Sequence, residues 1–409
     1  MRTDELRRPQ ATAGGFSPKR LTRLRELLER HVESGFVPGA VAVLARKGAK
    51  ARCTWKRWAI SRSRGQGRRL QWRGDTICRL GSMTKPIVAA CAITLVEDLT
   101  LRLDDPVDDL HPELASMTVL TDPHGPLRDT VAARRPIILR DLLTGTLGTG
   151  TVPAEPGTIP IAGALDALGY SSPDEWMRQL GELPLVHQPG ERWMHDSAAN
   201  VTGVLIARAT GMSFGEALRE RICGPLGMKD TAFSVSGESI GRLATAYEHD
   251  NAATGEPVVE DGPDGRFSRP RAFESNGGGL VSTADDYLAF ASALLAGGTH
   301  QGQRILSRPS VALMTGDHLT PEQKAISRFW PGYFDAMGWG FGMSIRTRRT
   351  QLFPSVGSYG WPGFYGTAWY IDPAEDLTAI FMMQRAHAGD QRLPMWHDLW
   401  TAVYQAIDD

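Results

Sequence analysis

Segments with the character of β-strands lie near both ends of this chain, and segments with helical character lie between them. Residues 39–45 form a short apolar run bounded by glycine and by a lysine–glycine pair, which is typical of a strand inside a sheet. In the last quarter, residues 339–345, 367–371 and 377–383 are rich in β-forming residues and bounded by Gly, Pro and Asp. We therefore expect an α/β domain built from both termini, with a helical domain inserted between its two parts.

Helical periodicity marks most of the remaining chain. After Ser17-Pro18, apolar residues such as Leu21, Leu24 and Leu28 recur on one face of a predicted helix. Further helices are expected over residues 83–97, 199–209, 214–222, 283–295 and 394–407. The predicted division is a disordered leader (1–16), an α/β sheet domain (17–80 and 276–409) and a mostly helical domain (81–275).

Composition narrows the class of protein. The chain has 409 residues, of which 42% are hydrophobic and 22% charged, so global disorder, collagen and coiled coil are excluded. It has no apolar run of about 18 residues, the length that a membrane span needs, and its first residues lack the apolar core of a signal peptide. These observations predict a cytoplasmic protein with no membrane partner. The cysteines show no metal-ligand spacing, so we expect buried thiols and no metal: Cys53, Cys78, Cys91 and Cys223.

Charge is unevenly distributed along the chain. The net charge is −1, yet residues 46–73 contain eleven Lys and Arg and no Asp or Glu, which leaves −12 (−1 minus 11) for the remainder. The simplest interpretation is one or two edge strands that charge protects from pairing. A second is a docking surface for an anionic partner, such as a carrier protein or a phosphorylated or carboxylated molecule. Three tryptophans lie among the basic residues, which suits nucleic acid, but no nucleic-acid motif accompanies them, and we predict no such partner.

Ser82-Met-Thr-Lys85 is the only Ser-x-x-Lys sequence in the chain. A spacing of three on a helix places both side chains on one face. A desolvated lysine can deprotonate the serine, and a helix N-terminus stabilises the negative charge that develops. The motif opens an apolar helix, which is where a serine nucleophile would be displayed. In the simpler alternative, Ser82 only caps that helix.

Residues 75–86, Asp-Thr-Ile-Cys-Arg-Leu-Gly-Ser-Met-Thr-Lys-Pro, resemble the nucleophile segment of the serine β-lactamase and penicillin-binding-protein superfamily. The class C-like and family VIII carboxylesterase branch is the best match. Further segments follow in family order and extend the resemblance over residues 17–409: 138–144, 188–193, 203–211, 225–231, 277–284, 338–342 and 367–383. The resemblance implies the β-lactamase-like fold, an α/β (α+β) architecture with an antiparallel sheet flanked by helices and an inserted, mostly helical domain. It also implies an active site in the cleft between the two domains.

The second family motif is altered in this chain. A Tyr-x-Asn or Tyr-x-Ser normally follows the Pro-Gly-x-x-Trp segment, and its tyrosine acts with the lysine as general base. The matching residues here are Trp193-Met-His195-Asp196-Ser197. His195 therefore stands at the tyrosine position, where it would exchange protons, and Ser197 keeps the small polar position of a substrate-binding residue. The alternative is a histidine that fills space in a site that has lost hydrolysis.

The third motif is Lys-Thr-Gly in β-lactamases, and its best counterpart here is Trp361-Pro-Gly363, as in family esterases with Trp-x-Gly. The resemblance makes Gly363 a substrate-binding residue and suggests an oxyanion hole from the backbone N–H of Ser82 and an N–H near Phe364. The aromatic residues nearby either line a hydrophobic acyl or aryl pocket or pack in the core: Tyr359, Trp361, Phe364 and Tyr365.

Two other segments depart from the motifs above. Residues 145–150, Gly-Thr-Leu-Gly-Thr-Gly, stand where the family usually has a His-Thr-Ser-Gly-like turn, and they predict a roomier or more mobile edge of the site. Gly237-Glu-Ser239-Ile-Gly241 matches the Gly-x-Ser-x-Gly elbow of α/β-hydrolases. That elbow needs a strand before it, and the preceding residues make a poor one, so we do not expect Ser239 to be a nucleophile.

Together these residues predict a serine hydrolase that acts on a carboxylic ester or activated acyl group through an acyl-enzyme on Ser82. Lys85 would take the proton of Ser82, His195 would shuttle a proton to the leaving group, and no cofactor is implied. The expected partner is a small-molecule ester or acyl substrate. An acyltransferase or other specialised biosynthetic enzyme is the first alternative, and a binding protein that has lost turnover is the second. β-Lactam hydrolysis ranks below these, because Lys-Thr-Gly is missing.

Overall fold

The computed structural model describes residues 15–47, 53–61, 72–169, 171–250, 257–327, 329–386 and 392–408. Its centre is a seven-stranded sheet in the order β11-β12-β13-β14-β15-β1-β2, in which every neighbouring pair is antiparallel. Both ends of the chain supply strands, as predicted. The strands are β1 (Gly39–Lys47), β2 (Cys53–Ser61), β11 (Met337–Trp339), β12 (Ser344–Arg346), β13 (Tyr359–Pro362), β14 (Ala368–Asp372) and β15 (Leu377–Met382).

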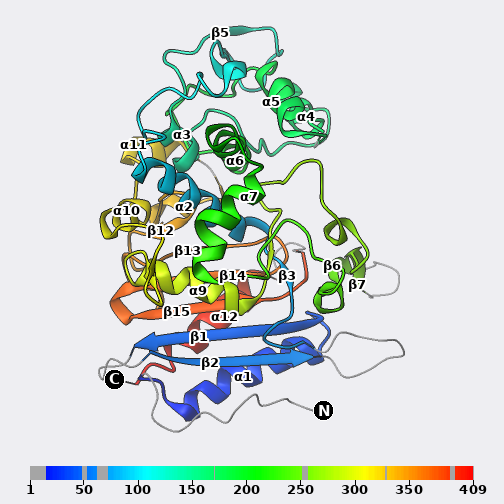
Figure 1. The fold of residues 1–409 in the computed structure, drawn as a ribbon, viewed down its shortest axis with the longest axis vertical. Helices are drawn as coiled ribbons and strands as arrows, with labels where there is room; N and C mark the ends of the chain where they lie inside the picture. Colours follow the sequence, from blue (N-terminus) through cyan, green and yellow to red (C-terminus); the bar gives the residue numbers. More distant parts are fainter. Residues whose placement is uncertain are drawn as a thin grey trace.

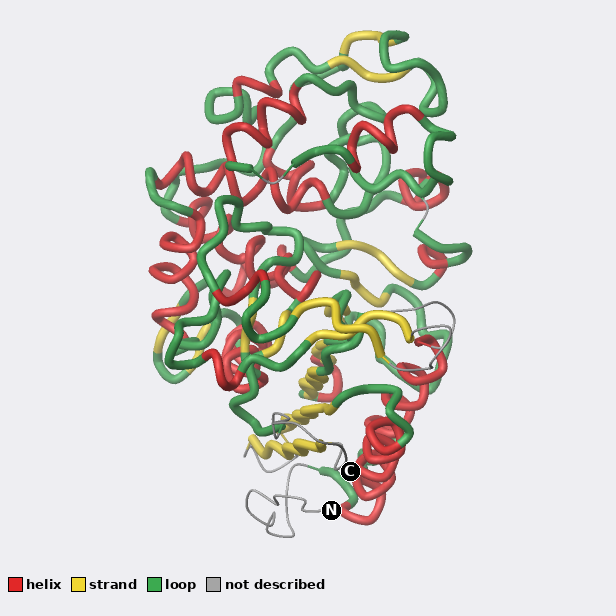
Figure 2. Tube along the Cα trace, turned by 90° about the vertical axis from the view of Figure 1, so that its right-hand side faces the viewer, coloured by secondary structure: helices red, strands yellow, loops and turns green. Residues whose placement is uncertain are grey.

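Most helices lie between these strands in sequence. In Figure 1 most of them lie above β1 and β2, and the view turned by 90° in Figure 2 shows helices on both sides of the strands. The helices are α1 (Pro18–Glu33), α2 (Thr84–Glu97), α3 (Leu139–Thr144), α4 (Pro160–Asp166), α5 (Pro173–Gly181), α6 (Ser197–Thr210), α7 (Phe214–Leu218), α8 (Gly224–Leu226), α9 (Ala284–Leu295), α10 (Arg308–Met314), α11 (Pro321–Ile326) and α12 (Arg392–Tyr404). Short strand pairs outside the main sheet are β3 (Cys78–Arg79) with β8 (Val281–Ser282), β4 (Thr118–Leu120) with β5 (Thr130–Ala132), β6 (Ala246–Asp250) with β7 (Pro257–Asp261), and β9 (Thr299–His300) with β10 (Gln303–Arg304).

Helices cover both faces of the sheet because its strands carry apolar side chains on both sides. In β1, Ala42 and Leu44 join the apolar cluster formed with α1 and α12, whereas Val41 and Val43 join the larger cluster that includes α2 and α9. This alternation follows the two-residue repeat of a strand. The larger cluster continues from the sheet into α3, α5 and α6, so the sheet part and the helical part share one core.

Two strand predictions need correction. Residues 339–345 are not one strand but the two sides of a hairpin, β11 and β12, in which the Gly340 N–H donates to the Met343 carbonyl at 2.9 Å. The sequence did not predict β13 as a strand, because Gly360 and Pro362 are weak β-formers. β13 is nevertheless an interior strand, and it ends beside the predicted active site.

Several sequence predictions concern the edges of the described structure. Residues 1–14 of the predicted leader lie outside the described residues, and Phe16 is buried and bridged to Ile407. β2 forms an edge of the sheet, as predicted for the basic stretch. Residues 48–52 and 62–71 of that stretch lie outside the description, and docking of an anionic partner there stays a prediction. Among the described helices, none has the length and apolar character that crossing a bilayer requires.

Candidate active site

Ser82 lies in a tight 3₁₀ turn, η1 (Gly81–Met83), between β3 and α2. The turn is fixed from several sides. Thr367 Oγ1 donates to the Leu80 carbonyl at 2.7 Å, and the buried Tyr287 hydroxyl donates to the carbonyl of the last residue of the turn at 2.9 Å. The surrounding core therefore fixes the backbone from which the Ser82 side chain projects.

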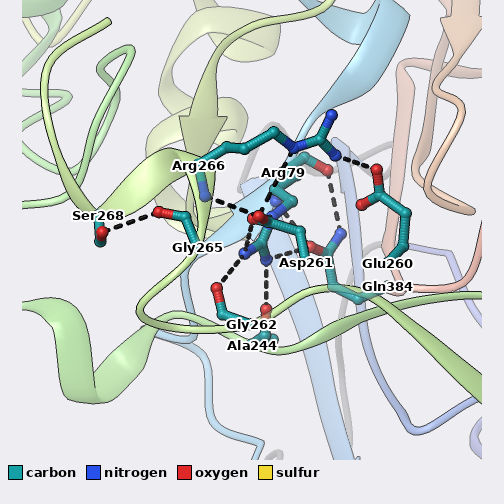
Figure 3. A network of polar contacts seen from close by, with 9 residues as sticks. All are labelled: Arg79, Ala244, Glu260, Asp261, Gly262, Gly265, Arg266, Ser268 and Gln384. Carbon is teal, nitrogen blue, oxygen red and sulfur yellow. Dashed lines mark hydrogen bonds and ion pairs between the residues drawn. The ribbon is translucent and has the colours of Figure 1, made fainter.

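Arg79, three residues before Ser82, anchors the strand that leads into this turn (Figure 3). Its side chain is fully buried, and its guanidinium donates to Asp261 Oδ2 through Nε at 2.7 Å and also through Nη2. Gln384 acts on the Arg79 backbone: its Oε1 accepts from the N–H at 2.9 Å and its Nε2 donates to the carbonyl at 3.0 Å. The network ties β3 to the β6–β7 hairpin and to the residues after β15.

Lys85 is brought to Ser82 by the first turn of α2, as the Ser-x-x-Lys spacing predicts. Its Nζ donates to Ser82 Oγ at 3.0 Å, to Asp196 Oδ1 at 2.6 Å and to the Gly277 carbonyl at 2.6 Å. The lysine is only 5% exposed. The serine and the buried amine are therefore in direct hydrogen-bond contact, the arrangement that a lysine-activated nucleophile requires.

Asp196 is a site residue that the sequence reasoning missed. Its backbone has φ +90°, unusual for a residue other than glycine, and it directly precedes α6. This conformation accompanies a carboxylate placed on Lys85, whose charge lowers the Asp196 pKa to about 2. The Asp196 side chain remains 42% exposed. The signal in the sequence was an acidic residue directly beside the altered His195 position.

His195 lies next to this ion pair and is flanked by aromatic rings. Its ring stacks on Phe329 with centroids 5.3 Å apart and is 6.2 Å from the Trp361 ring. Burial, together with the Lys85 charge, lowers the His195 pKa to about 4. The imidazole is therefore neutral near pH 7 and has one nitrogen free to accept a proton.

The glycine-rich segment 145–150 is packed, which corrects the prediction of a roomy or mobile edge. All six residues are buried. The Met194 N–H donates to the Gly145 carbonyl and the Thr151 N–H donates to the His195 carbonyl, both at 2.8 Å. The segment and the Thr151 that follows it thus form a fixed support for the backbone of Met194 and His195.

An aromatic wall extends from His195 toward solvent. Phe329 contacts Trp193 at 5.3 Å and Trp361 at 5.6 Å between ring centroids, and Trp330 packs on it at 4.4 Å. Trp361 is buried, whereas Trp330 is 50% exposed. The wall therefore joins His195 to a partly exposed apolar surface at Trp330.

The end of β13 lies against η1, the turn that carries Ser82. Gly81 has φ +56°, and a Cβ placed on it would stand 2.6 Å from the Phe364 backbone nitrogen. Gly363 donates its N–H to the Thr367 carbonyl at 2.8 Å, and the Phe364 ring is 54% exposed. Glycine at position 81 thus permits a close approach of the Phe364 backbone, and an oxyanion hole formed by the N–H groups of Ser82 and Phe364 stays a prediction.

Other predicted residues have different surroundings. Tyr359 is buried and contacts Trp369 in the core at 6.2 Å between ring centroids, so it takes the core alternative. Tyr365 packs with Ala246 and Ala386 in a separate small cluster. Ser197 begins α6 and is half-buried. Ser239 lies in a turn and accepts from Arg242 Nη2 at 3.0 Å, so no strand–elbow–helix surrounds it.

A small cavity of about 30 Å³ opens on the α6 side of Lys85 and is bordered by His195, Asp196 and Thr202. Within the described part of the chain, no group of His, Cys, Asp or Glu side chains is arranged to hold a metal ion. Cys78, Cys91 and Cys223 are buried free thiols.

Comparison with known proteins places this geometry in a family. The model of the family described as Beta-lactamase matches residues 24–402. Protein Rv1367c of Mycobacterium tuberculosis is 40% identical, over 76% of this chain and 78% of that protein. Esterase EstB of Burkholderia gladioli is 31% identical, over 93% of this chain and 94% of the esterase. Other relatives bear the names of acyltransferases.

The solved structures agree with the fold described above. Unliganded simvastatin synthase (LovD) from Aspergillus terreus superposes with a TM-score of 0.76 at 25% identity, over 95% of this chain and 98% of that one. The fold is therefore β-lactamase-like, with mixed helices and an antiparallel sheet.

Proposed function

This chain belongs to the beta-lactamase family, and from that premise we propose that it is a serine enzyme that forms an acyl-enzyme on Ser82. The substrate is a carboxylic ester or another activated acyl compound, and the acyl group is then released to water. The observation that carries the proposal is the 3.0 Å hydrogen bond between Lys85 Nζ and Ser82 Oγ in a buried setting.

The proposed reaction follows from the groups around Ser82. Lys85 takes the Ser82 proton as Oγ attacks the acyl carbon, and backbone N–H groups of the Ser82 and Phe364 segments stabilise the oxyanion. The neutral His195 ring passes the proton to the leaving-group oxygen as its bond to the acyl carbon breaks. Water then attacks the acyl-enzyme, with the same groups moving protons in reverse order.

The aromatic wall supports an apolar acyl or aryl substituent on the substrate. Phe329, Trp361 and the half-exposed Trp330 offer ring faces rather than charges beside the reacting groups. Burial of an apolar group against such rings contributes about 25 cal/mol per Å² of surface removed from water. We therefore propose esters with an extended apolar or aromatic group as better substrates than acetyl esters.

Acyl transfer to an alcohol or amine acceptor is the second candidate, and the relatives named as acyltransferases favour it. The two candidates share the first half-reaction and differ only in what attacks the acyl-enzyme. Product analysis with p-nitrophenyl butyrate, with and without an added alcohol acceptor, separates them. Transfer predicts a new ester at the expense of free butyrate, and hydrolysis predicts free butyrate in both samples.

The direct test compares the unaltered protein with Ser82→Ala and Lys85→Met. We expect release of p-nitrophenol by the unaltered protein, an acyl adduct in its intact mass, and at least a thousandfold loss in both variants, on the scale of catalytic-nucleophile deletions. Thermal unfolding of all three proteins controls for folding. Turnover that survives Ser82→Ala would contradict the proposal. Absence of turnover and adduct with both short and aryl esters would favour a non-catalytic binding role.

A further inference from the structure

The environment of Lys85 contains one charged group that the Ser-x-x-Lys motif does not account for, the Asp196 carboxylate. Its Oδ1 accepts from Lys85 Nζ at 2.6 Å, as short as the bond from Nζ to the Gly277 carbonyl and shorter than the 3.0 Å bond to Ser82 Oγ. The titratable side chains that the structure places against Lys85 are Asp196 and His195. The site therefore pairs its amine with a carboxylate rather than with a phenol.

The number of bonds around the Lys85 nitrogen gives this pairing a chemical meaning. An amine nitrogen has three positions besides its carbon. Two of them face the acceptors Gly277 and Asp196, which can only receive hydrogens, and the third faces Ser82 Oγ. When the amine is neutral, both shorter bonds keep their hydrogens, so its lone pair must point at the Ser82 hydroxyl. Asp196 thus helps to fix the direction in which Lys85 acts as a base.

The backbone around Asp196 is arranged to hold the carboxylate there. Asp196 keeps φ +90°, a conformation that costs about 1–3 kcal/mol in a residue other than glycine and that concentrates at functional sites. A Cβ on Gly277 would lie 2.8 Å from Asp196 Oδ1, so only glycine leaves room for the carboxylate. Asn200, one turn further along α6, accepts from the Gly277 N–H at 2.9 Å and fixes the facing segment.

We propose that Asp196 is a positioning residue for acyl transfer, one that directs Lys85 at Ser82 and balances the ammonium charge formed when Lys85 takes the serine proton. This inference rests on the proposed function. In the step concerned, the Ser82 O–H bond breaks as a Lys85 N–H bond and the Oγ–acyl bond form. The proton then passes to the leaving-group oxygen through His195, and Lys85 returns to its starting state. Asp196 exchanges no proton in this sequence.

The test uses Asp196→Asn, which keeps the shape of the side chain, and Asp196→Gly, which also removes the strain. We expect the single-turnover acylation rate of both to fall about 10- to 100-fold, in the range of lost electrostatic contacts at active sites. KM should stay within about threefold, and the acid limb of the pH–rate profile should move to lower pH, because a negative charge next to the base has been removed. Asp196→Gly should be at least as stable as the unaltered protein.

Asp98→Asn is the matched control. Asp98 forms an ion pair with Arg221 at 2.8 Å and is 40% exposed, close to the 42% of Asp196. It should keep the acylation rate and the pH profile. If both Asp196 variants also keep them while Ser82→Ala is inactive, the positioning role is wrong and the proposed function stands. If Ser82→Ala remains active, the proposed function is the part that fails.

Discussion

Two cation–carboxylate pairs flank η1, the turn that carries Ser82, and they differ in burial and in their other hydrogen-bond partners. Arg79–Asp261 precedes Ser82 and is dry, with side-chain exposures of 0% and 3%. Lys85–Asp196 follows it and is half open, with exposures of 5% and 42%. The buried guanidinium also donates to backbone carbonyls and takes no part in the contacts of Ser82. The amine instead donates to the Ser82 hydroxyl.

The comparison separates an ion pair that holds the backbone from an ion pair that contacts the proposed reacting group, Ser82. A fully buried arginine destabilises the fold unless partners balance its charge and accept its hydrogen bonds, because an unpaired buried charge is very unfavourable. Such a pair fixes the backbone. Gln384 adds hydrogen bonds to both the N–H and the carbonyl of Arg79. The second pair keeps one member partly exposed beside the pocket at Lys85, as the proposed reaction requires. We expect the first pair to govern stability and the second to govern rate.

The largest expected effect is on stability. Asp261→Asn leaves the Arg79 charge buried without its counter-charge, and the free energy of unfolding should fall by about 3–5 kcal/mol. Urea unfolding measures this. Asp105→Asn, in the exposed pair Arg102–Asp105 with side-chain exposures of 72% and 55%, should cost less than about 1 kcal/mol. Equal losses of stability in the two variants would contradict the prediction that burial of the Arg79 pair makes it important for stability.

The next effect is a loss of folding stability at acid pH. His111 is buried between the Val201 carbonyl and Arg208, and burial lowers its pKa to about 4. An unfolded histidine titrates near pH 6.5. Between these values the unfolded chain binds more protons than the folded one, so stability falls as pH drops from about 6.5 to 4, by about 2 kcal/mol at pH 5 relative to pH 7 for one such residue.

This acid effect sharpens the comparison, because Asp196, with a pKa of about 2, stays ionised throughout that window. The loss should therefore come from the buried histidines and not from the pair at the active site. Urea unfolding at pH 7 and pH 5 should show a smaller difference in His111→Asn. His124→Asn, at a position with 72% side-chain exposure, serves as control. An unchanged pH dependence in His111→Asn would contradict the assignment.

A change at Gly277 tests the second pair without altering any charge. In Gly277→Ala the new methyl group would stand 2.8 Å from Asp196 Oδ1 and displace it from Lys85. The acylation rate should fall about tenfold, which corresponds to about 1.4 kcal/mol, while the free energy of unfolding changes by less than about 1 kcal/mol. Gly237→Ala, where a Cβ meets nothing within 4 Å, should leave the rate unaltered. A normal acylation rate in Gly277→Ala would show that Lys85 works without this contact.

The smallest effect, on kcat/KM, is expected at Trp330, at the exposed end of the aromatic wall. Trp330 is half exposed and packs on Phe329, so Trp330→Ala should lower kcat/KM for aryl or long-chain esters about threefold to fivefold and leave acetyl esters unchanged. Val131→Ala, an exposed apolar position on β5 in the helical part, should change neither. Equal losses for both kinds of ester would place the aromatic wall outside the acyl pocket.

Local contacts and the sheet could be predicted from the sequence, whereas the two carboxylates that pair with Arg79 and Lys85 could not. The contact between Ser82 and Lys85 was predictable because it depends on local helical spacing, and the sheet was predictable because strand patterns mark both ends of the chain. Asp196 was not, because its role depends on a positive φ and on a glycine 81 residues further along, at position 277. Asp261 likewise reaches Arg79 only through the β6–β7 hairpin.

The aromatic residues show the same limit within one strand. Tyr359 and Trp361 share a face of β13 by the two-residue repeat. Only the tertiary structure places one against Trp369 in the core and the other beside His195. The sequence left both alternatives open for good physical reason, since a buried aromatic and a pocket aromatic have the same local pattern.

The most direct test measures rate and stability on the same preparations of Asp196→Asn and Asp261→Asn. Single-turnover acylation by p-nitrophenyl butyrate gives the rate, and urea unfolding gives the stability. We predict that Asp196→Asn loses at least tenfold in rate and stays within about 1 kcal/mol in stability, because a buried amine, unlike a guanidinium, can lose its proton when its counter-charge is removed. Asp261→Asn should lose about 3–5 kcal/mol and, while folded, keep its rate within about threefold. Proportional losses of rate and stability in both variants would contradict the division between a holding pair and a reacting pair.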